Sequence, residues 1–168
     1  MEPMINRIGG EPQVQLLVNH FYDLIETIPQ GATIMAMHQK GHGLAHVRPE
    51  QFNFLCGFFG GRRYYHELHG HMNLREIHAH VEIRTQDAED WLAVMDRAMV
   101  ETNVAEAERG QIMATFRRAA LMLRGRRLGY RIYAASNIVH LIATACAILL
   151  WLMTVYLSVI AVVLFFYC

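Results

Sequence analysis

The last part of the chain constrains the fold most, because it is long, uncharged and almost entirely apolar. Beyond Arg131 the sequence contains no Asp, Glu, Lys or Arg. The apolar run over 138–168 is longer than the roughly 20 residues that a helix needs to cross a bilayer. A soluble helix of this length without a polar face is unusual, so we expect a transmembrane helix over 137–168. A buried core helix, or a tail read in a shifted frame, would give the same composition.

The charges before this run are unevenly divided. All fifteen acidic residues lie at or before Glu108 together with eight basic residues, so this part has a net formal charge of −7. The charged residues from Arg109 to Arg131 are all basic. We therefore expect a folded domain over 1–125, a basic juxtamembrane segment over 126–136 and the apolar helix over 137–168. Because basic flanks stay on the cytoplasmic side, the domain is expected in the cytoplasm, anchored to the inner (cell) membrane.

Composition also excludes several classes of protein. An acidic domain argues against nucleic-acid binding, which needs a basic face. The first residues lack the basic start and apolar core of a signal peptide. The three cysteines form no CxxC pair or disulfide framework, and Cys56 lies in an apolar run typical of the core.

Helical periodicity dominates the domain, and no segment shows convincing strand alternation, so we expect an all-α fold. A stripe of apolar residues predicts a first long helix over about 11–28, which Pro29 ends. The segment over 30–46 is rich in glycine and histidine and is interpreted as a loop, with at most one helical turn around 34–38. Pro49 suits the first position of the next helix, and Gly60-Gly61 ends that helix.

Three further helices are expected after a short polar stretch. The first is a short piece over 74–78. The second runs from Ala88 to about Thr102 with Asp87 as its N-cap. The third begins near Val104 and continues into the arginine-rich segment.

Several short motifs follow one another in a distinctive order within this domain. Their order and spacing resemble the truncated haemoglobins of group II, from Gly9 to about Arg124. The resemblance implies a 2-over-2 helical sandwich that holds haem b. The matching residues are Ile8-Gly9-Gly10, Phe21-Tyr22, Phe54-Leu55, Phe59-Gly60-Gly61, Tyr65, Gly70-His71, Leu74-Arg75, His78, Ile83, Trp91-Leu92 and Met95.

The iron of a haem needs a neutral imidazole on its proximal side. His78 ends the short helical piece, and Leu74 and Ile77 provide apolar neighbours. The resemblance implies that His78 is the axial ligand. His80 is its rival, but at helical spacing it faces a different side.

On the distal side the resemblance implies that Tyr22 and Trp91 donate hydrogen bonds to a bound ligand. Gln51 aligns with a further distal position when counted back from Gly60. Val47 aligns with the distal histidine of larger globins, and an apolar residue there would leave Tyr22 and Trp91 as the main donors.

The residue at one distal position and the residues that bind the haem propionates are not settled by the motifs. Either His38 or Lys40 occupies the start of the distal loop, because the loop is about two residues longer than usual. Haem propionates need cations or donors, for which Arg75 is the first candidate and Tyr65 and His71 are weaker ones.

The function expected from this resemblance is the binding or transport of O2 or another diatomic gas, with nitric oxide or peroxide chemistry as an extension. The sequence contains no flavin motif or reductase domain, so catalysis would need an external reductase and no enzymatic activity is assigned. Two alternatives are a membrane-anchored haem sensor or redox component, and a tail-anchored interaction protein without haem. A third alternative is a Zn²⁺ or Ni²⁺ site among the six histidines between positions 38 and 71, although their spacing is irregular.

Overall fold

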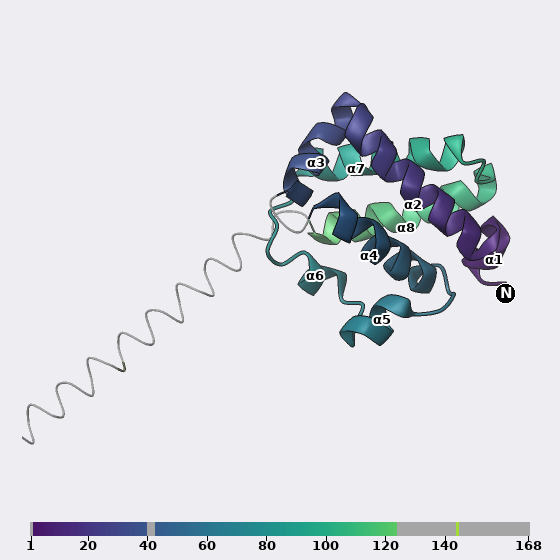
Figure 1. The fold of residues 1–168 in the computed structure, drawn as a ribbon, viewed down its shortest axis with the longest axis horizontal. Helices are drawn as coiled ribbons and strands as arrows, with labels where there is room; N and C mark the ends of the chain where they lie inside the picture. Colours follow the sequence, from purple (N-terminus) through teal and green to yellow (C-terminus); the bar gives the residue numbers. More distant parts are fainter. Residues whose placement is uncertain (1, 40–42, 124–143, 145–168) are drawn as a thin grey trace, which may run out of the picture. The chain divides into compact units, whose positions relative to one another are not determined.

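The structure is a computed structural model that describes residues 2–39, 43–123 and 144 (Figure 1). Residues 1–126 form one compact unit. The described part of this unit contains helices and no strand, which confirms the all-α expectation. Its elements are α1 (Met4–Ile8), α2 (Gly10–Thr27), the 3-10 turn η1 (Pro29–Gly31), α3 (Ala32–Gln39), α4 (Leu44–Phe58), α5 (Tyr64–His69), α6 (Leu74–Ile77), α7 (Thr85–Glu101) and α8 (Glu106–Leu123).

Four long helices build the core as two pairs. Helix α2 packs on α4, α7 packs on α8, and α2 also contacts α7, so one pair lies against the other (Figure 1). The expected stripe of α2 is its buried face, where Val14, Leu17 and Phe21 have no exposed surface. Burying one such side chain stabilises the fold by roughly 1.5–3 kcal/mol, so this stripe stabilises the packing of α2 in the core.

The expected loop over 30–46 is wrong, because most of this segment is helical. The turn η1 is followed by α3, and α4 already begins at Leu44. Gly31 permits the tight approach to α2, since a Cβ there would lie 2.2 Å from the carbonyl oxygen of Ile25. In α3 only Ile34 is fully buried, so the segment has no repeating apolar stripe that would have revealed a helix.

The expected role of Pro49 is also wrong, since Pro49 lies inside α4 rather than at its first position. A proline there removes one backbone bond, the one that would reach the carbonyl of Ala45 near the start of the helix. The packing of α4 against α2 and α5 maintains the helix through this position. The expected end of α4 is confirmed, because Gly60 takes a left-handed φ of +87° directly after it.

Asp87 stabilises the start of α7, but it is not the N-cap. The N-cap is Arg84, whose backbone N–H donates to Asp87 Oδ2 at 2.9 Å. The Arg84 guanidinium also pairs with Asp87 at 2.7 Å, and these bonds hold the pKa of the buried Asp87 below its usual value. Helix α5 was not expected at all, because none of its six residues is buried.

The expected transmembrane helix over 137–168 and the basic segment over 126–136 lie outside the described residues, apart from Thr144. Within the part that the structure describes, no helix is both long enough and apolar enough to cross a bilayer.

Candidate functional site

Three predicted distal residues meet although they come from three different helices. Tyr22 of α2 is completely buried, and its O–H donates to Oε1 of Gln51 on α4 at 2.7 Å. The ring of His38, near the end of α3, stands edge-on to the Tyr22 ring with 5.8 Å between the ring centres. The bond to Tyr22 leaves the Gln51 amide N–H₂ group free to donate to a further acceptor.

Arg48 of α4 lies over the Tyr22 ring of the cluster formed by Tyr22, Gln51 and His38. Its guanidinium lies 5.4 Å from the centre of the Tyr22 ring, donates to the Asn19 carbonyl at 3.0 Å, and pairs with Asp23 at 2.9 Å and Glu26 at 2.7 Å. Burial raises the pKa of Tyr22, and the charge of Arg48 offsets only part of that rise. The Tyr22 phenol therefore remains protonated and able to donate at neutral pH.

Trp91 on α7 contacts the aromatic residue next to Tyr22 on α2 and an aromatic residue of α8. Its half-buried ring meets Phe21 at 5.4 Å and Phe116 at 5.3 Å, in both cases edge to face. Its indole N–H is a donor that could serve a bound molecule.

His78 lies directly after α6, as its C-cap residue. Its Nδ1 is 2.8 Å from the Leu74 carbonyl oxygen. Since a carbonyl only accepts, Nδ1 carries the ring proton and Nε2 is bare. Burial lowers the pKa of His78, the Leu74 carbonyl opposes that shift, and nearby His80 lowers the pKa further. His78 is thus neutral at physiological pH with Nε2 free, which is the state that binds a metal ion. The rival His80 is exposed.

His38 has the same arrangement. Its Nδ1 lies 2.9 Å from the Ile34 carbonyl oxygen, so Nδ1 again carries the proton. Burial lowers the pKa of His38, against the effect of that carbonyl. In this neutral tautomer Nδ1 carries the ring proton and Nε2 carries none. Lys40, the other candidate for this position, is outside the described residues.

The candidate rim residues come from α5, from α6 and from the segment between them. Arg75 is exposed on α6, and its guanidinium forms no ion pair within the described chain. The ring of Tyr65 on α5 is tilted by 40° to that of His69 with ring centres 4.3 Å apart, and His71 lies 3.9 Å from Glu76. Among these three, only Arg75 presents a free cation suited to a propionate.

A flat apolar macrocycle held through its iron needs apolar side chains beside a neutral imidazole. Val47 is one of several half-buried apolar residues that pack against the core. The half-buried apolar residues packed against the core include Met35, Met37, Leu44, Val47, Phe52, Phe54, Phe58, Trp91 and Met113.

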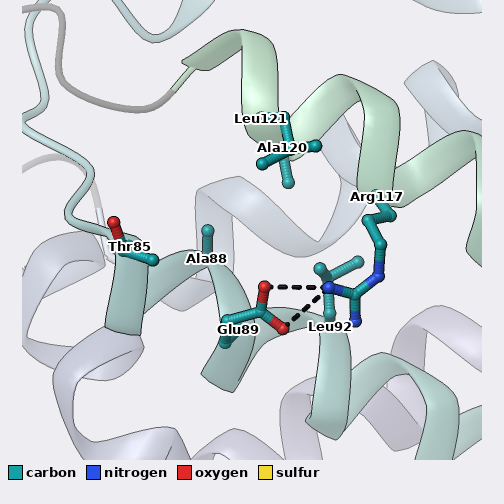
Figure 2. Close-up of a pocket in the computed structure, with 7 residues that line it drawn as sticks. All are labelled: Thr85, Ala88, Glu89, Leu92, Arg117, Ala120 and Leu121. Carbon is teal, nitrogen blue, oxygen red and sulfur yellow. Dashed lines mark hydrogen bonds and ion pairs between the residues drawn. The ribbon is translucent and has the colours of Figure 1, made fainter.

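Figure 2 shows a separate pocket between α7 and α8. Across it, Arg117 pairs with Glu89 at 2.9 and 3.1 Å. Its cavity volume of about 10 Å³ is far below the roughly 300–1,000 Å³ of ordinary ligand pockets. It shares no residue with the site described above, so we do not assign it to a cofactor. The lining residues are Thr85, Ala88, Glu89, Leu92, Arg117, Ala120 and Leu121.

The histidines do not gather into a separate metal site in the described chain. No three His, Cys, Asp or Glu side chains lie close enough there to hold a metal ion. His69 instead pairs with Glu50 at 2.7 Å, and the His38 ring is bonded to its own helix.

Comparison with known proteins decides the family. The profile of the bacterial-like globins matches residues 4–124. The chain belongs to the bacterial-like globin family. Haem iron is the cofactor of globin homologues.

Individual relatives of this globin confirm the resemblance to group II. The group 2 truncated haemoglobin YjbI of Bacillus subtilis (strain 168) is 32% identical over 90 residues, which cover 54% of this chain and 64% of the relative. The alignment thus spans less than two thirds of that relative's length. The group II 2-on-2 haemoglobin of Agrobacterium tumefaciens is 31% identical with a TM-score of 0.69, over 74% of this chain and 95% of its own. The group II truncated haemoglobin of Bacillus anthracis is 30% identical with a TM-score of 0.66, over 74% and 92%. These structures confirm the truncated globin fold.

The sequence did not reveal the role of Arg48 in this globin. Its partners on α2 are more than 20 positions away along the chain. One signal was present: Arg48 stands three residues before Gln51, so the two share a face of α4.

Proposed function

We propose that this globin binds haem b through Nε2 of His78 and takes O2 or another diatomic gas on the side of Tyr22, Gln51 and Trp91. The observation that carries the proposal is the bond from His78 Nδ1–H to the Leu74 carbonyl, because it leaves the ring neutral and Nε2 free. When bound, haem supplies an iron with an open axial position for the gas.

The residues around His78 prepare it for this role. The Leu74 carbonyl fixes the tautomer and the rotation of the ring, as the outer partners of metal-bound histidines do. Partial burial keeps the ring neutral, so a proton does not compete for Nε2.

On the gas-binding side, Gln51 and Tyr22 form one unit. In the structure the Tyr22 O–H donates a hydrogen bond to Oε1 of Gln51, and the Gln51 N–H₂ group remains available to donate. A small polar ligand can then be held by the Gln51 amide, by the Trp91 N–H, or by the Tyr22 O–H after a rotation about its C–O bond. Nitric oxide or peroxide chemistry would need electrons from a separate reductase, so we propose gas binding as the primary activity.

A haem titration of the full-length protein tests this proposal. Wild type should bind one haem and develop a Soret band, whereas His78→Ala should lose histidine-ligated absorption. His80→Ala is the matched control and should behave as wild type. A colourless wild-type protein, or loss of the band in His80→Ala alone, would refute the proposal.

We also propose that residues 138–168 anchor the globin to the inner membrane, with the arginines before them on the cytoplasmic side. The support is the uncharged length of that run and the bases that precede it. Full-length protein should sediment with membranes, and a chain truncated after Arg131 should not. Recovery of both forms in the supernatant would contradict the anchor.

A further inference from the structure

Arg48 attaches the first half of α4 to α2 through several contacts of one guanidinium group. This group donates to the Asn19 carbonyl oxygen at 3.0 Å and pairs with Asp23 at 2.9 Å and Glu26 at 2.7 Å. It also lies 5.4 Å from the centre of the Tyr22 ring. These four residues have the i, i+3, i+4 and i+7 spacing of one helix face. Arg48 therefore binds α2 on both sides of Tyr22 along the chain.

The first half of α4 contains no fully buried residue. The two buried residues of this helix, Leu55 and Cys56, both lie in its second half. Pro49 follows Arg48 directly and has no backbone N–H to bond to Ala45, so the helix is also weaker here. A segment with few fully buried contacts opens more easily than the core. The polar contacts of Arg48 therefore limit the movement of this half of α4 relative to α2.

Gln51 lies in the same part of α4, three residues after Arg48. Residues three positions apart share a helix face. Gln51 Oε1 accepts the Tyr22 O–H at 2.7 Å, so this bond joins the same two helices that Arg48 joins. If α4 moved relative to α2, the bond would lengthen and the Tyr22 hydroxyl would lose its direction.

We propose that Arg48 is a positioning residue for the proposed gas-binding side. It holds the turn of α4 that carries Gln51 against the turn of α2 that carries Tyr22, and it thereby slows the release of a bound gas. Arg48 acts through Tyr22 and does not touch the gas. A planar guanidinium suits this role because its N–H groups bind several acceptors in a fixed geometry. This inference rests on the proposed function, in which Tyr22 donates to the gas.

The experiment measures O2 dissociation after stopped-flow mixing of haem-loaded, full-length protein with CO. Arg48→Met keeps the length of the side chain but removes its polar contacts. The dissociation rate should rise about fivefold, as expected when a hydrogen bond to the gas is partly lost. Arg62→Met is the matched control, because Arg62 also lies over a tyrosine ring, 4.6 Å from the centre of Tyr64, and also pairs with a carboxylate, that of Glu67. This control should release O2 as fast as wild type.

A double variant tests whether Arg48 acts through Tyr22. Tyr22→Phe combined with Arg48→Met should release O2 no faster than Tyr22→Phe alone, because no hydroxyl remains to be positioned. A loss of stability alone would not depend on Tyr22 in this way. Should Arg48→Met not fold, Asp23→Asn combined with Glu26→Gln removes both ion pairs while Arg48 stays in place. That variant should also release O2 faster than wild type.

The outcomes separate this inference from the proposed function. A wild-type dissociation rate in Arg48→Met, or in the variant of both carboxylates, overturns the positioning role and leaves gas binding intact. An equal rise in Arg62→Met overturns it too, as does a double variant in which the effects of Arg48→Met and Tyr22→Phe multiply. A wild type that takes up no haem overturns the proposed function, and this inference with it.

Discussion

Tyr22 and Arg48 show how single side chains define the side of the site on which we propose that gas binds. Tyr22 is fully buried with its only polar atom bonded to Gln51, so its hydroxyl has a defined direction. Arg48 lies over its ring and binds three groups on α2. The position of the Tyr22 donor therefore depends on contacts made by a residue outside the core.

Removing the Tyr22 hydroxyl should accelerate gas release. A hydrogen bond to a partly charged acceptor contributes roughly 1.5–3 kcal/mol, so Tyr22→Phe should raise the O2 dissociation rate about tenfold or more. Stopped-flow replacement of O2 by CO measures that rate. Tyr64→Phe is the control, because the Tyr64 hydroxyl bonds to Glu11 instead. An unchanged rate in Tyr22→Phe would exclude Tyr22 from ligand stabilisation.

Loss of the Arg48 charge should weaken the attachment of α4 to α2. Arg48→Met keeps the length of the side chain but removes the ion pairs to Asp23 and Glu26, so the free energy of unfolding should fall by about 1 kcal/mol. Urea unfolding measures this quantity. Arg62→Met is the comparison, since Arg62 pairs with Glu67 only five positions away. Equal effects of the two substitutions would contradict a specific role for Arg48.

At the scale of helices, the start of α7 depends on a buried carboxylate. Asp87 accepts the backbone N–H of Arg84 and pairs with its guanidinium, and the ion pair needs the ionised form of the carboxyl group. Trp91 and Leu92 follow Asp87 by about one turn of α7. Asp87 therefore also helps to position Trp91, a residue of the candidate site, and Leu92, a residue of the core.

Asp87→Asn should lower the free energy of unfolding by about 1 kcal/mol at neutral pH. Because the folded pKa of Asp87 is depressed, its contribution is complete above the ordinary carboxyl pKa of about 3.9 and is lost as pH falls through the lower folded value. The difference between wild type and variant should therefore shrink in acid. Chemical unfolding at pH 7 and pH 3 tests this, and a difference that grows in acid would contradict it.

The sequence predicted those helices whose apolar stripe repeats over several turns. Helix α2 was expected within about one residue of its observed ends, because seven of its residues are buried on one face. Helices α3 and α5 were missed because they bury one residue and none. The sequence motifs predicted Tyr22, Gln51 and His38 as site residues. They did not predict the contacts among them, because these contacts join separate helices. The bond from His38 to the Ile34 carbonyl, which determines the tautomer, also could not be predicted from the spacing of the motifs.

At the scale of the whole molecule, the described helical body consists of two pairs of helices with half-buried apolar side chains packed on its core. A ligand that binds only the folded state stabilises it by mass action, so haem and the helical body should stabilise each other. The proposed binding of haem and gas depends on one coordinate bond from His78.

Chemical rescue of His78→Gly in the full-length protein tests that bond most directly. The absorption spectrum of the ferrous protein is recorded with and without added imidazole. We expect the glycine variant to lose the spectrum of histidine-ligated haem, and we expect added imidazole to restore it by occupying the vacated space. A glycine variant that keeps the wild-type spectrum without imidazole would show that His78 is not the iron ligand.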